Sequence, residues 1–78
     1  MKKRRNISGE RIRLARLSEK PPATQKDISA RLELNGIILS DSSIGKIEHG
    51  ASAVTDIQLK AFAKVLKVKI SWLLYEDE

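Results

Sequence analysis

The chain has 78 residues, of which 41% are hydrophobic and 32% charged, with a net charge of +5 and no cysteine. This length fits one small domain, and the lack of cysteine excludes a disulfide framework and cysteine-based zinc sites. A single histidine supplies no multi-histidine metal site. No nucleophile–base pair, paired catalytic carboxylates or phosphate-binding glycine loop is present. We therefore predict a protein that is not an enzyme and uses no metal or cofactor.

The positive charge is concentrated at the start of the chain. Residues 1–20 hold eight basic and two acidic side chains, whereas residues 21–78 hold seven basic and eight acidic ones. This asymmetry predicts a polyanionic partner, although the first six residues could also be a solubilising tail. The longest apolar stretches have three or four residues, as at 72–75, and a membrane span needs about 20. No apolar segment follows the basic start as in a signal peptide, so we expect a cytoplasmic protein with no membrane contact.

The first half of the chain predicts two helices. Residues 8–19 are rich in arginine, leucine and alanine, and Ser8 is the expected N-cap. Pro21-Pro22 ends this helix. A second helix spans 24–33, where Thr24 and Asp27 approximate a capping box.

The second half predicts three more helices. The apolar run at 37–39 has no partner strand, so we expect a loop that packs onto the core. The third helix starts within 40–43 and stops at His49-Gly50, with Gly50 as the C′ residue. The fourth begins after Thr55-Asp56, and its buried face is formed by Leu59, Phe62, Ala63 and Leu66. A short fifth helix covers about 70–75, so the fold class is all-α with short connections.

Several segments together resemble a known family. They are Arg11-Ile12-Arg13-Leu14-Ala15-Arg16, Thr24-Gln25-Lys26-Asp27-Ile28 and Ile44-Gly45-Lys46-Ile47-Glu48-His49-Gly50, followed by Leu59, Phe62, Ala63, Leu66, Val68, Ile70 and Leu73. In this order the chain resembles the lambda-repressor-like (Cro/XRE-type) helix-turn-helix DNA-binding family over about 8–74. The resemblance implies a compact five-helix domain at 8–75 whose third helix enters the major groove. A basic arm at 1–7 precedes this domain and an acidic tail at 76–78 follows it.

The resemblance also implies roles for particular residues. It places Gln25 on a DNA phosphate and puts Ser42, Ser43 and Lys46 at base edges. It pairs Arg16 with Glu48 as a structural ion pair, and it places Trp72 and its neighbour Leu74 in a dimer contact. Each has an ordinary alternative: the two serines as helix caps, Lys46 and Gln25 as solvated side chains, and Trp72 as part of the core.

Further DNA contacts follow from residue chemistry. The additional candidates are Lys26, His49, Arg4 and Arg5, which can meet phosphates. Asp41 either caps the third helix or accepts a hydrogen bond from cytosine N4.

Three features depart from the family pattern, and one of them is a slightly long first connection through Lys20-Pro21-Pro22. The connection at 33–40 is about five residues longer than a compact helix-turn-helix allows, which leaves the tilt of the third helix open. Gly45 lies inside that helix, where glycine costs about 1 kcal/mol relative to alanine. It permits either close packing or close approach to DNA.

The predicted function is a sequence-specific double-stranded DNA-binding transcriptional regulator of the repressor-like family. We expect a homodimer on a palindromic operator, with half-sites about 34 Å apart. The alternative is an antitoxin-like module that uses the same fold to bind a second protein. That alternative predicts one exposed apolar patch formed by Trp72, Leu74, Tyr75 and the run 37–39.

Overall fold

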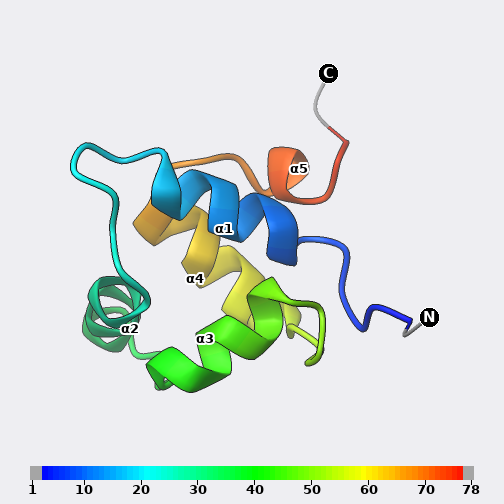
Figure 1. Cartoon of the computed structure of the whole chain (residues 1–78), viewed down its shortest axis with the longest axis horizontal. Helices are drawn as coiled ribbons and strands as arrows, with labels where there is room; N and C mark the ends of the chain where they lie inside the picture. Colours follow the sequence, from blue (N-terminus) through cyan, green and yellow to red (C-terminus); the bar gives the residue numbers. More distant parts are fainter. Residues whose placement is uncertain (1–2, 77–78) are drawn as a thin grey trace.

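Five helices and no strand make up residues 3–76, the part of the chain that the computed structural model describes (Figure 1). The helices are α1 (Gly9–Leu17), α2 (Gln25–Leu34), α3 (Asp41–Glu48), α4 (Asp56–Leu66) and α5 (Ile70–Leu73). The all-α prediction is confirmed for this part of the chain. The predicted arm residues 1–2 and tail residues 77–78 lie outside the described residues.

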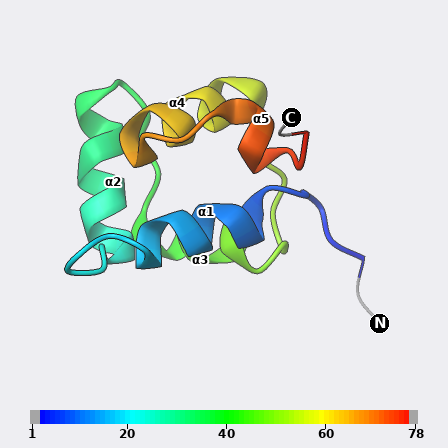
Figure 2. The ribbon, with the colours of Figure 1, turned by 90° about the horizontal axis from the view of Figure 1, so that it is seen from above.

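The helices form two facing layers closed at one end. In Figure 2, α1 and α3 lie on one side and α4 and α5 on the other, while α2 crosses the end. α1 packs against α3, α4 and α5, and α2 packs against both α3 and α4. This arrangement leaves one face of α3 turned away from every other helix.

Local capping chemistry sets most helix starts. Thr24 and Thr55 each form a complete capping box, with Asp27 and Gln58 as the returning side chains. The Thr24 prediction is therefore confirmed. Gly50 follows the C-cap of α3 with a φ of 77°, as expected for a C′ glycine.

The predicted N-cap position of α1 is confirmed, but the side-chain cap expected there is not present. Ser8 occupies the N-cap position, but its side chain makes no capping hydrogen bond, because its backbone is already helical (φ −93°, ψ −14°) rather than extended. Asn6 takes this role instead: its Oδ1 accepts a hydrogen bond from the Gly9 N–H at 2.7 Å. The Ser8 hydroxyl is buried and has no hydrogen-bond partner within residues 3–76.

The core consists of aliphatic side chains packed around one aromatic residue, Phe62. Phe62, Ala63 and Leu66 of the predicted α4 stripe are buried, and Leu59 packs against them half-buried. The lengthened α2–α3 connection contributes as well, because Ile37 and Leu39 pack onto the core. Within residues 3–76, no helix is long and apolar enough to cross a membrane.

Candidate nucleic-acid interface

The outward face of α3 carries a polar stripe. Ser42, Lys46 and His49 follow one another at i, i+4 and i+7 and are exposed, so they share one side of the helix. Ile44 and Ile47 are buried on the opposite side. α3 is therefore anchored by its apolar side and presents this stripe to solvent.

The first turn of α3 is held by side chains that the sequence assigned to DNA. Ser40, not Ser42 or Ser43, is the N-cap: its Oγ accepts from the Ser43 N–H at 3.1 Å and donates to the Ser43 Oγ at 3.0 Å. Asp41 Oδ1 accepts from the Ser42 N–H at 2.9 Å. Asp41 and half-buried Ser43 thus support the helix start, while the Ser42 side chain points into solvent.

The start of α2 lies directly against the middle of α3. Gln25 is half-buried, and its Nε2 donates to Glu48 Oε1 at 3.1 Å. A Cβ at Gly45 would lie only 3.3 Å from that same Nε2. Gly45 therefore serves close packing of Gln25 on α3. Lys26, the next residue of α2, is exposed.

The structure brings the predicted pair Arg16 and Glu48 together in the interior. Arg16 Nε and Nη2 donate to the two carboxylate oxygens at 2.8 and 2.9 Å, and Nη1 donates to the Ala23 carbonyl at 2.9 Å. The two side chains are 10% and 1% exposed. The hydrogen bonds to Glu48 raise the pKa of Arg16 above its ordinary value. One ion pair thus ties α1 to α3 and to the segment that leads into α2.

The arm folds back onto the C-terminal end of α3. The Arg5 N–H donates to the Gly50 carbonyl at 2.8 Å, and Arg4 Nη1 and Nη2 donate to the His49 and Glu48 carbonyls at 3.2 and 3.1 Å. A guanidinium here meets the negative end of the helix dipole. Arg4 Nε also donates to the Asn6 carbonyl at 3.4 Å, so all three guanidinium nitrogens of Arg4 bond within the protein, whereas the Arg5 side chain is exposed.

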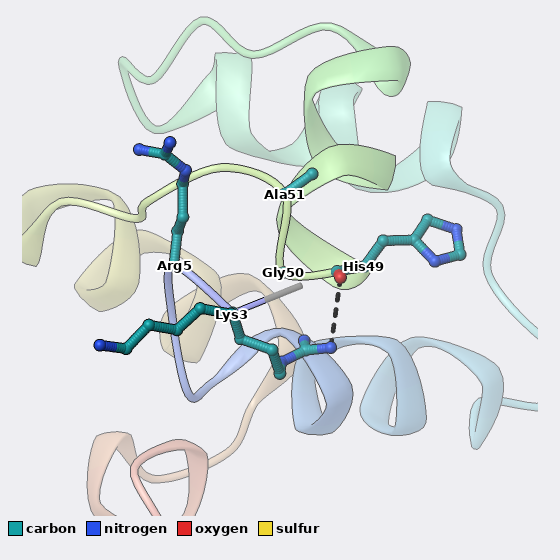
Figure 3. Close-up of a pocket in the computed structure, with 6 residues that line it drawn as sticks. Lys3, Arg5, His49, Gly50 and Ala51 are labelled. Atoms are coloured by element: carbon teal, nitrogen blue, oxygen red, sulfur yellow. Dashed lines mark hydrogen bonds between the residues drawn. The ribbon is translucent and has the colours of Figure 1, made fainter. Parts of the chain in front are cut away.

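The folded arm creates a basic cleft beside α3. Lys3, Arg5 and His49 line it together with Arg4, Gly50 and Ala51, and its volume is about 520 Å³. In Figure 3 the side chains of Lys3 and Arg5 project outward in different directions around the end of the helix. Lys3 belongs to the same basic run as the predicted Arg4 and Arg5.

The predicted dimer residues lie at α5, away from the α3 stripe. Trp72 and Leu74 are half-buried. The Arg11 guanidinium lies 4.8 Å from the Trp72 ring centroid and 4.0 Å from that of Tyr75. Trp72 also lines an open groove of about 420 Å³ that includes exposed Leu14. A dimer contact at this groove stays a prediction.

Comparison with known proteins identified no relative of this chain. No family model, curated protein or solved structure matches the chain. The family resemblance seen in the sequence therefore stays a prediction, and the function is inferred from the α3 stripe, the start of α2 and the arm.

Proposed function

We propose that this protein is a sequence-specific DNA-binding regulator of transcription that places α3 in the major groove. The observation that carries the proposal is the exposed stripe Ser42, Lys46 and His49 on a helix whose opposite side is buried. The major groove is about 12 Å wide and admits one α-helix. A polar, cationic helix face set outward in this way has the dimensions and chemistry to read base edges.

The stripe offers hydrogen-bonding groups, and none of its three residues is acidic. Lys46 can donate to guanine O6 and N7, and the Ser42 hydroxyl can donate or accept. The carboxylates nearest in sequence are engaged elsewhere: Asp41 accepts from the Ser42 N–H, and Glu48 is buried against Arg16. Burial against Arg16 therefore keeps the Glu48 charge away from DNA phosphates.

Basic groups on other elements flank the stripe. Lys26 extends from the start of α2, which packs on the middle of α3. Lys3 and Arg5 extend from the arm at the C-terminal end of α3. Contacts to phosphates on both sides of a recognition helix fix its register, while the base edges supply specificity.

We further propose a homodimer on a two-fold symmetric operator. The groove beside Trp72 and Leu14 is open and largely apolar, as a self-association surface requires. The antitoxin-like alternative needs one apolar patch that joins α5 to the run 37–39. The α2–α3 connection lies away from α5 in both views of the ribbon (Figures 1 and 2), so DNA binding is the better-supported function.

Selection from random double-stranded DNA at about 0.15 M salt, followed by sequencing, tests the proposal. A palindromic motif with half-site centres about one helical turn apart is the expected result. The double variant Ser42→Ala/Lys46→Ala serves as the control and should not recover the motif. Failure of the wild-type chain to enrich any motif, or recovery of the same motif by the variant, would refute reading by α3.

A further inference from the structure

Asn6 joins three separate segments through one buried side chain. Its Nδ2 donates to the Ile47 carbonyl at 3.0 Å and to the Ser52 carbonyl at 2.7 Å, and its Oδ1 accepts from the Gly9 N–H at 2.7 Å. The residue is 9% exposed. The arm, the start of α1, the end of α3 and the chain beyond α3 therefore meet at this amide.

Two glycines provide the space for this junction. A Cβ at Gly9 would lie 2.1 Å from the Ile47 carbonyl oxygen, so α1 approaches α3 closer than any other residue type permits. A Cβ at Gly50 would lie 2.6 Å from Arg4 Cζ. Residues 4–6 of the arm are thus accommodated by the small residues that they contact, and this part of the arm packs as part of the domain.

We propose that Asn6 is a positioning residue that holds the arm as a prefolded part of the DNA interface. The proposal rests on the proposed function of the α3 stripe. Asn6 fixes the backbone of 4–6, Arg4 closes the end of α3, and Lys3 and Arg5 are left to meet phosphates. A free arm loses backbone entropy when it binds, whereas this arm has already lost that entropy during folding.

The geometry of the cations indicates the kind of ligand. Lys3 and Arg5 project in different directions and do not converge on one point (Figure 3). Such an arrangement suits successive phosphates of a nucleic-acid backbone rather than one small anion. It places these phosphates beside the last turn of α3, next to His49.

A double-mutant cycle on DNA affinity tests the proposal. Affinity for the selected duplex is measured between about 50 and 200 mM salt for the wild type, Asn6→Ala, Lys3→Ala/Arg5→Ala and the triple variant. Asn6→Ala should weaken binding on the order of tenfold and reduce the salt slope by up to about 1.8, the equivalent of two phosphate contacts. The triple variant should bind like Lys3→Ala/Arg5→Ala, because Asn6 then has no cations left to position.

A matched control separates positioning from stability. Thr55→Ala removes the capping side chain of α4, distant in sequence from the arm, and should leave DNA affinity and salt slope unchanged. Hydrogen exchange of the Arg5 amide, measured without DNA, reports whether the arm is held against the Gly50 carbonyl, and Asn6→Ala should abolish the protection of this amide.

The outcomes that overturn the inference are distinct from failure of the proposed function. If Asn6→Ala lowers DNA affinity equally in the wild type and in the Lys3→Ala/Arg5→Ala variant, Asn6 acts only by stabilising the fold. Wild-type affinity in Asn6→Ala would remove any positioning role. A wild-type chain that binds no duplex at any of these salt concentrations would refute the proposed function itself, while Arg5 amide exchange would still show whether Asn6 fixes the arm.

Discussion

Replacing Arg16 by methionine should destabilise the protein severely, because it strands a buried carboxylate. The substitution removes three hydrogen bonds of 2.8 to 2.9 Å, two of them to Glu48. The Glu48 side chain is 1% exposed, and Gln25 Nε2 would be the side-chain donor left to it.

The expected loss is about 3–5 kcal/mol, the range for breaking a buried pair from one side. A domain of this size has a free energy of unfolding of roughly 4–12 kcal/mol, so Arg16→Met removes a large share of it. Urea denaturation followed by circular dichroism measures the loss. With a slope of about 1 kcal/mol per M, the midpoint should fall by about 3–5 M or the fold should be lost in buffer.

The pair Arg31–Glu19 is the matched control. It has the same two-bond geometry, with both distances 2.8 Å, but its side chains are 38% and 31% exposed. Arg31→Met should cost no more than about 1 kcal/mol, because solvent screens the pair and rehydrates the remaining carboxylate.

Equal costs for the two methionine variants would refute the stranded-charge reasoning. The double variant Arg16→Met/Glu48→Leu gives a second test, because it removes both charges. It should recover most of the stability lost by Arg16→Met, since an apolar pair of similar volume is often as stable as a buried ion pair. A double variant less stable than Arg16→Met would point to packing rather than charge.

Three further variants test other parts of the structure. Gly9→Ala should cost at least about 2 kcal/mol in urea denaturation, because its Cβ would meet the Ile47 carbonyl at 2.1 Å, and an unchanged midpoint would contradict this contact. The hydrogen bond from the Thr24 N–H lowers the pKa of Asp27 in the folded protein, so the unfolded chain binds more protons and the contribution of ionised Asp27 to stability is lost as pH falls below about 3.8. Asp27→Asn should therefore make the melting temperature less dependent on pH in that range, and a profile identical to that of the wild type would refute this link between Asp27 ionisation and stability. Lys46→Ala should weaken binding to the selected motif by about 1–3 kcal/mol and to random DNA by less, whereas equal losses would make Lys46 a phosphate contact.

Features fixed by near neighbours in the chain could be predicted from the sequence. Thr24 and Asp27 are three residues apart and meet within one helical turn, so the capping box needed no tertiary information. The end of α3 at Gly50 is local as well, because the positive φ of the C′ position favours glycine. The core stripe of α4 followed from its period, because an amphipathic helix on a small domain has only one way to bury an apolar face.

The arm could not be predicted, because long-range contacts decide its position. Both Asn6 and Ser8 are good capping residues, and a local rule does not choose between them. The choice is made by the Ile47 and Ser52 carbonyls, which lie 41 and 46 residues away from Asn6. For the same reason the sequence assigned Arg4 wholly to DNA, although its guanidinium bonds to the end of α3.

Glu48 connects the fold to every element that flanks the proposed DNA-reading face. Its carboxylate accepts from Arg16 of α1 and from Gln25 of α2, and its carbonyl accepts from Arg4 of the arm. An apolar contact can slide, but paired hydrogen bonds to a guanidinium allow only one register. The variant Arg16→Met/Glu48→Leu should therefore fold stably yet bind the selected DNA motif more weakly than the wild type, because α1 and α2 both lose the polar contacts that fix their positions against α3. Wild-type affinity in that variant would show that apolar packing by itself orients α3.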